Sequence, residues 1–88
     1  MSQRKKLLQQ IIQNRNNVKF NDFTSLIERF GFVHHRTDGS HHIYKHKEVV
    51  EVLNLQNVKG KAKPYQIKQF FLMVEKYNLK MKGEEEGL

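Results

Sequence analysis

The segment from residue 34 to residue 46 holds every histidine of this 88-residue chain. These are His34, His35, His41, His42 and His46. The unperturbed pKa of a histidine is about 6.5, so an imidazole can take or give a proton near neutral pH. The cluster is therefore the first candidate for acid–base catalysis, although a solvated or structural histidine is the commoner use of this residue.

All five histidines lie on a predicted β-hairpin. Residues 32–37 and 40–46 are short runs with β-branched and aromatic residues, and Asp38-Gly39 joins them. Asp-Gly is typical of a type I′ turn, because both central residues of that turn take a positive φ. A two-residue loop at this point pairs Thr37 with Ser40, Arg36 with His41, His35 with His42, and His34 with Ile43.

This register would place His41 and Arg36 opposite each other on one face of the hairpin. The same face carries Phe32 and Ile43, so we expect it to be the core-facing side, with His41 and Arg36 at its rim beside the turn. The other, more exposed side would carry His35, His42, Tyr44 and His46.

A histidine beside an arginine can cleave RNA. The imidazole of His41 can take the proton from a ribose 2′-hydroxyl as that oxygen attacks the adjacent phosphate, and the guanidinium of Arg36 can stabilise the negative charge that develops on the phosphoryl oxygens. This chemistry needs no metal ion and no other cofactor. His41 is therefore the candidate catalytic residue, and Arg36 and the neighbouring Ser40 are candidate substrate-binding residues.

A histidine cluster can instead bind a metal ion, and two strand histidines on one face could hold zinc. The spacing of these histidines matches neither a helical i, i+4 pair nor a zinc finger, and the chain has no cysteine to support them. Nearby carboxylates are also few. We predict that the chain has no metal site.

A basic connection precedes Pro64, which is well placed as the first residue of a helix. Its lysines and the free N–H groups of the first helical turn could hold phosphate oxygens, so Lys61 and Lys63 are candidate substrate-binding residues. A solvated loop is the alternative. Tyr44 and Tyr65 could stack on unpaired bases, although single tyrosines are more often partly buried packing residues.

The periodicity of apolar residues predicts three helices around the hairpin. Residues 3–14, 22–30 and 64–77 repeat apolar side chains at helical spacing, and Gly31 ends the second of these helices. The valine- and leucine-rich residues 49–55 predict a third strand. This order predicts an α+β sandwich with helices on one face of a small three-stranded antiparallel sheet.

The charge of the chain favours a polyanionic partner. The net charge is +7, and because three of the nine acidic residues lie in the last six positions, residues 1–82 carry 16 basic and 6 acidic side chains, or +10. RNA, DNA or an acidic protein would fit that surplus, and solubility alone is the alternative. No apolar run approaches the ~18 residues of a membrane span, so we expect a cytoplasmic protein with no membrane contact.

The residues from Phe23 to Phe32, followed by Arg36 and by the run Gly39-Ser40-His41-His42-Ile43-Tyr44, resemble the HicA family of toxins from bacterial toxin–antitoxin pairs. The most specific feature is Gly-Ser-His after a helix that ends in Gly-Phe. The resemblance spans residues 22–78 and implies a fold similar to the double-stranded RNA-binding domain, α-β-β-β-α. It also implies cleavage of mRNA, a catalytic histidine at His41, and a HicB-type antitoxin that holds the toxin in check.

The resemblance divides the chain into an N-terminal helical extension (residues 1–20), a HicA-like RNA-binding and nuclease domain (21–79) and a flexible tail (80–88). One departure concerns residues 54–65, where many members of the family have a proline with a histidine or arginine and then Gly-Thr-Leu. The main alternative function is a non-catalytic RNA-binding module, because this type of fold can bind RNA by shape and phosphates without cutting it.

Overall fold

The computed structural model describes the backbone of residues 3–81 and the side chains of residues 8–81. Its elements are α1 (Gln3–Gln13), α2 (Phe20–Arg29), β1 (Val33–Asp38), β2 (His41–Lys45), β3 (Leu53–Gln56) and α3 (Pro64–Tyr77). The strands form one antiparallel sheet in the order β1-β2-β3. The predicted α-β-β-β-α order is thus confirmed, with α1 added before it.

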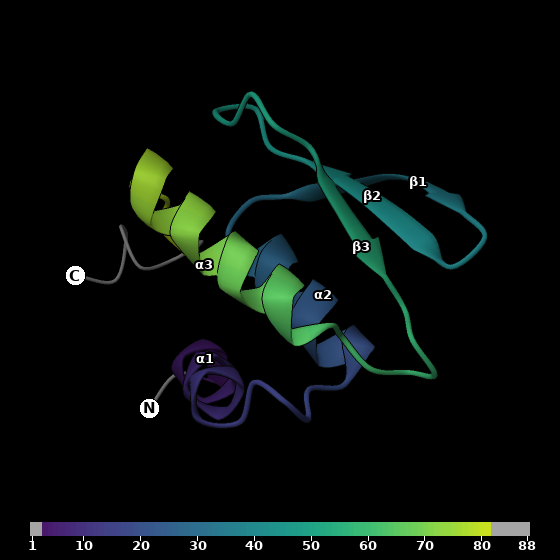
Figure 1. The fold of residues 1–88 in the computed structure, drawn as a ribbon. Helices are drawn as coiled ribbons and strands as arrows, with labels where there is room; N and C mark the ends of the chain where they lie inside the picture. The colour runs from purple at the N-terminus through teal and green to yellow at the C-terminus, as the bar shows by residue number, and fades with distance from the viewer. Residues whose placement is uncertain (1–2, 82–88) are drawn as a thin grey trace.

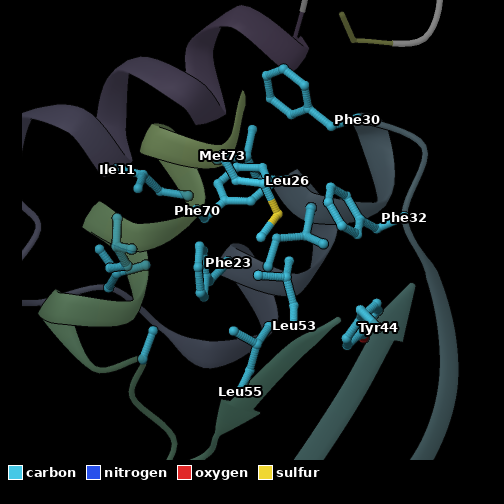
Figure 2. Close-up of a cluster of buried hydrophobic side chains, with 14 of the residues drawn as sticks. Ile11, Phe23, Leu26, Phe30, Phe32, Tyr44, Leu53, Leu55, Phe70 and Met73 are labelled. Carbon is cyan, nitrogen blue, oxygen red and sulfur yellow. The ribbon is translucent and has the colours of Figure 1, made fainter. Parts of the chain in front are cut away.

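The three helices lie to one side of the sheet, and α1 is the one farthest from it (Figure 1). We call the helix-facing side of the sheet the inner face and the opposite side the outer face. Figure 2 shows Tyr44 of β2 and Leu53 and Leu55 of β3 directed from the inner face toward Phe23 of α2 and Phe70 of α3. All five side chains are buried, so the core lies between the inner face and the helices.

Two helices match their predicted ranges closely, and α2 begins two residues before the predicted start. The side chain of Phe20 is buried, and its backbone N–H donates a hydrogen bond to the carbonyl oxygen of Gly60 over 2.8 Å. Lys19 precedes the helix without a capping side-chain hydrogen bond, and Asn21, a residue type that favours the N-cap position, lies inside the first turn. Burial of Phe20 therefore outweighs the capping preference of Asn21.

The third strand is shorter than predicted, because a turn at residues 47–48 and a bend at residues 50–51 precede it. The N–H of Val49 donates a hydrogen bond to the carbonyl oxygen of His46 over 3.1 Å, and the side chain of Val50 is 90% exposed. Valine content alone made this segment resemble a strand.

The predicted register of the hairpin is wrong. The two-residue loop is Gly39-Ser40, and Asp38 is the last residue of β1, directly opposite His41. Gly39 has φ +59°, whereas Ser40 has no positive φ. Glycine at the first central position is the pattern of a type II′ turn, which also matches the twist of a hairpin, so the turn uses Gly-Ser instead of Asp-Gly.

The predicted faces of β2 are wrong for the same reason. Tyr44 is 4% exposed on the inner face, and His41 projects from the outer face. A bulge at His35 shifts the register again between His34 and Arg36. It puts His34 opposite Tyr44 and leaves Arg36 on the outer face, because one extra residue exchanges the faces of a strand.

Met81 is buried in the core cluster. Residues 82–88, most of the predicted tail, lie outside the described residues. None of the helices in the described part of the chain is long and apolar enough to span a membrane.

Candidate active site

His41, the first residue of β2, is exposed, and its side chain forms a hydrogen bond with Asn54. Its Nδ1–H donates a hydrogen bond to Oδ1 of Asn54 over 3.0 Å. An amide oxygen can only accept, so this contact keeps the proton of the neutral imidazole on Nδ1. The lone pair is then on Nε2, which is the form that a general base requires.

Strand alternation brings these two side chains to the outer face. The register of β2 and β3 pairs His41 with Gln56 and Ile43 with Asn54, so Asn54 is the diagonal neighbour of His41. The Cα atoms of diagonal neighbours are roughly 7 to 8 Å apart, a span that a histidine and an asparagine side chain can bridge. The strand register thus builds the His41–Asn54 pair.

A pocket of about 350 Å³ opens beside His41, where the edge of β3 meets the first turns of α3. It is lined by His41, Val52, Leu53, Asn54, Gln56, Tyr65, Gln66 and Gln69. Within the described part of the chain, the lining contains no lysine, arginine or carboxylate. The pocket therefore offers amide groups, one aromatic ring and one imidazole.

Gln66 fixes the wall of this pocket. Its Oε1 accepts a hydrogen bond from the backbone N–H of Gln56 over 3.1 Å, and its Nε2 donates one to the carbonyl oxygen of Asn54 over 2.9 Å. The side chain is buried, and both of its polar groups are satisfied. Gln66 therefore holds the start of α3 against β3 and the backbone that carries Asn54.

Arg36 shares the outer face with His41, as predicted, but as a diagonal neighbour. It pairs with Ile43, and its Nε lies 3.4 Å from Oδ2 of Asp38. Asp38 takes the position opposite His41 that was expected for Arg36. Ser40 is exposed in the turn, where its carbonyl oxygen accepts a hydrogen bond from the N–H of Asn57 over 2.9 Å.

The two predicted lysines lie at different places. Nζ of Lys61 donates a hydrogen bond to Oδ1 of Asn17 over 2.6 Å, so this ammonium group is directed to the connection between α1 and α2. Nζ of Lys63 lies 5.6 Å from the ring centroid of Tyr65, which lines the pocket. Of these two lysines, Lys63 is therefore the one that lies next to a residue of the pocket lining.

Tyr44 occupies the inner face and packs in the core. Burial, followed by the negative charge of Glu28, raises the pKa of Tyr44 above its usual value. Its hydroxyl donates a hydrogen bond to Oε2 of Glu28 over 3.4 Å. The ring has no free face for a base, whereas Tyr65 is 62% exposed.

The inner-face histidines make structural contacts. His42 packs on the Phe20 ring at a centroid distance of 4.8 Å, and its Nδ1 lies 3.4 Å from the Thr37 hydroxyl. The same hydroxyl lies 2.8 Å from Nε2 of His34. These contacts hold β1 and β2 together at the edge of the core.

His46 closes the end of α2. Its Nε2–H donates a hydrogen bond to the carbonyl oxygen of Phe30 over 3.1 Å, and its Nδ1 accepts one from the N–H of Glu48 over 3.0 Å. Gly31 has φ +97°, and a Cβ there would lie 3.0 Å from Nε2 of His46. Glycine is thus required at residue 31 both for its conformation and for this close approach.

No group of three or more histidine, cysteine or carboxylate side chains converges on a point that could hold a metal ion within the described residues. The histidines separate onto the two faces of the sheet instead.

Tyr65 was already a candidate for stacking on bases, whereas the sequence did not indicate the other pocket residues, which are Asn54, Gln56, Gln66 and Gln69. Asn54 and Gln56 alternate with the buried Leu53 and Leu55, so a correct register would have placed them on the face of His41. The sequence carries no comparable signal for the buried Gln66, because its partners are backbone atoms of another element.

Comparison with known families returns the HicA toxin of bacterial toxin–antitoxin systems, matched over residues 20–73. The matched span runs from the first residue of α2 into α3 and includes His41 and Asn54. Searches of curated proteins and of solved structures gave no significant match. The family match covers more than half of the chain and agrees with the α-β-β-β-α order, and the chain therefore belongs to the HicA toxin family.

Proposed function

We propose that this chain is an endoribonuclease that cleaves mRNA without a metal ion, with His41 as the general base. The observation that carries the proposal is the hydrogen bond from Nδ1–H of His41 to Oδ1 of Asn54, 3.0 Å long. It orients an exposed imidazole and leaves Nε2 free to accept a proton. Membership of the HicA family supports the toxin role.

In the proposed reaction, Nε2 of His41 takes the proton of a ribose 2′-hydroxyl. The 2′-oxygen then forms a bond to the adjacent phosphorus atom, and the bond from phosphorus to the 5′-oxygen breaks. The products are a 2′,3′-cyclic phosphate and a 5′-hydroxyl, because the leaving 5′-oxygen takes a proton from solvent water. A positioned general base contributes typically 10²–10⁴-fold to such a step, so His41 is expected to dominate the rate.

Negative charge develops on the phosphoryl oxygens during this attack. Arg36 is the closest guanidinium on the same face, although Asp38 pairs with it at 3.4 Å. Lys63 lies beside the ring of Tyr65, which lines the pocket, and Ser40 lies in the turn next to His41. We assign Arg36, Ser40 and Lys63 to phosphate binding, where cationic and hydroxyl donors favour the transition state.

The test uses purified protein, a labelled single-stranded RNA and EDTA. The expected result is cleavage that survives EDTA and falls by about 10²-fold or more in His41→Gln, with circular dichroism and Tm unchanged. His42→Gln is the matched control, because it alters the adjacent imidazole on the inner face. Unchanged cleavage by His41→Gln would overturn the assignment. RNA that is bound by the wild-type protein without being cut would support the non-catalytic binding module instead.

Membership of a toxin–antitoxin family implies an antitoxin partner. We propose a HicB-type antitoxin and a cytoplasmic site of action, where mRNA is found. Expression of the chain alone should then arrest growth, and co-expression with the neighbouring gene should restore it. Normal growth with abundant wild-type protein would contradict the toxin role.

A further inference from the structure

We infer that the pocket between β3 and α3 binds one unpaired nucleobase of a single-stranded RNA next to the bond that is cut. The inference rests on the proposed function for its geometry, because His41 lies at the rim of this pocket. The base-binding site is an addition to the proposed function, because catalysis by His41 does not by itself require a pocket for a base. The first observation is the volume of about 350 Å³, which lies in the range of small-ligand sites.

The chemistry of the lining selects a neutral, planar, hydrogen-bonding ligand. The groups other than His41 are amides, one phenol ring and two aliphatic side chains. Amide groups pair with the donor and acceptor edges of bases, whereas phosphates and carboxylates need cations or rows of N–H groups. The lining therefore favours the base of a nucleotide over its phosphate.

Tyr65 supplies the surface on which a base can stack. It is 62% exposed, although it is a large aromatic residue in the first turn of α3. Single-stranded RNA is commonly held by bases stacked on aromatic rings and read at their polar edges. An exposed ring beside several amides matches this mode of binding.

The amides available to the base are those not already used by the fold. Both polar groups of the Gln66 side chain are hydrogen-bonded to the backbone of β3, and Oδ1 of Asn54 accepts a hydrogen bond from His41. Gln69 is exposed one turn after Tyr65, on the same side of α3. The side-chain amides of Gln56 and Gln69 are thus the groups expected to read the base, and Tyr65 is the ring expected to stack on it.

Lys63 places a positive charge next to this site, with Nζ 5.6 Å from the Tyr65 centroid. A nucleotide carries its phosphate beside its base, so base and phosphate can be held together at the pocket and its mouth. The two contributions are separable, because a phosphate contact changes the salt dependence of binding and a stacked base does not.

The experiment measures the Kd of short 2′-O-methyl RNA, which binds but cannot be cut because the attacking hydroxyl is blocked. Tyr65→Ala should raise Kd by about tenfold, as expected for the loss of one base–aromatic stack, and Tyr65→Phe should retain the wild-type Kd. Lys63→Ala should lower the slope of log Kd against log salt by about one, whereas Tyr65→Ala should leave that slope unchanged.

Two further arms test for the base itself. Oligonucleotides with one abasic position should bind wild type more weakly and Tyr65→Ala no more weakly than the intact strand. Gln69→Leu should change the preference among the four bases at that position. Leu72→Ala is the matched control, since Leu72 is 57% exposed on the same helix and outside the pocket.

The outcomes separate this inference from the proposed function. If Tyr65→Ala binds and cleaves like wild type while His41→Gln is inactive, the nucleobase site is overturned and the nuclease assignment stands. If Tyr65→Ala weakens binding but His41→Gln cleaves normally, the site stands and the catalytic assignment fails. If the wild-type protein binds no 2′-O-methyl RNA, the nucleobase site is overturned whatever the cleavage assay shows.

Discussion

His41 and His42 are neighbours in the sequence, and the two faces of the sheet give them different surroundings. His42 is half-buried on the inner face, against Phe20 and the Thr37 hydroxyl. His41 is exposed on the outer face, with one nitrogen fixed by Asn54 and a polar pocket beside it. The face of the strand therefore decides which imidazole is free to react with a ligand.

The same division holds for β3. Its inward side chains, Leu53 and Leu55, are buried, and the outward Asn54 and Gln56 line the pocket. Adjacent positions of one four-residue strand therefore serve stability and site geometry separately. Substitutions on the two faces should affect different measurements.

The largest expected effect comes from the inner face. Leu55→Ala should lower the free energy of unfolding by about 2–5 kcal/mol, because it leaves a cavity in a fully buried site. Urea denaturation followed by circular dichroism measures the change. Val50→Ala is the control, since Val50 is exposed. If Leu55→Ala lowered the free energy of unfolding by less than about 1 kcal/mol, the tight packing of Leu55 between the sheet and the helices would be contradicted.

A smaller effect is expected on the outer face, where Asn54→Leu should lower kcat for RNA cleavage about tenfold. The reason is the loss of one hydrogen bond that orients His41, and each ~1.4 kcal/mol of lost transition-state stabilisation is a tenfold loss in rate. Asn54 acts here as a positioning residue. The ring ¹⁵N shifts of His41 should show the loss of a fixed proton on Nδ1.

Thr37→Val is the matched control for Asn54→Leu, because it removes the hydroxyl beside His42 and leaves the outer face unaltered. We expect wild-type kcat and unchanged His41 ¹⁵N shifts in Thr37→Val. If Thr37→Val lowered kcat as much as Asn54→Leu does, the surroundings of His42 would matter to cleavage as much as those of His41, and the proposed difference between the two histidines would be wrong.

The smallest expected effect is on Tm, and it comes from the contacts between Glu51 and the end of α3. Glu51 accepts hydrogen bonds from the Tyr77 hydroxyl and from Nζ of Lys76, and these contacts, led by that of Tyr77, lower the pKa of Glu51 from 4.5 to about 2. A lowered folded-state pKa gives stability above the unfolded pKa that is lost as the pH falls. The Tm advantage of wild type over Glu51→Gln should therefore shrink between pH 4.5 and about 2.

Because the Glu51 side chain is 45% exposed, water and ions screen its contacts, so the shift in Tm should be modest and should decrease in high salt. Scanning calorimetry at several pH values measures it. A difference between the two proteins that stays constant from pH 6 to pH 2 would show that the Glu51 contacts do not hold α3.

The helices could be predicted from the sequence because each repeats apolar side chains over several turns. Pro64 begins α3 as expected, and Ile67 and Phe70 fill the core. The exact start of α2 could not be predicted, because the position of Phe20 depends on Gly60, which lies forty residues later in the chain. Local signals determine the helices, and long-range contacts determine their ends.

The choice of His41 depended on the family resemblance, whereas its surroundings depended on the register. Asp-Gly and Gly-Ser both fit a two-residue turn, and moving the turn by one residue replaced Arg36 with Asp38 opposite His41. The bulge at His35 leaves no clear mark in a sequence of two adjacent histidines. For this reason Asn54, which is unremarkable in sequence, could not be recognised as the partner of His41.

Gln66 has one more consequence, which concerns assembly. Its side chain forms hydrogen bonds with a backbone N–H group and a backbone carbonyl group of β3, on the edge of the sheet that faces away from β2, as a neighbouring strand would. A strand from another polypeptide would have to displace Gln66 to extend the sheet there. The edge of β1, on the far side of the sheet from the pocket, has no such side-chain substitute among the described residues, and the bulge at His35 is what interrupts it.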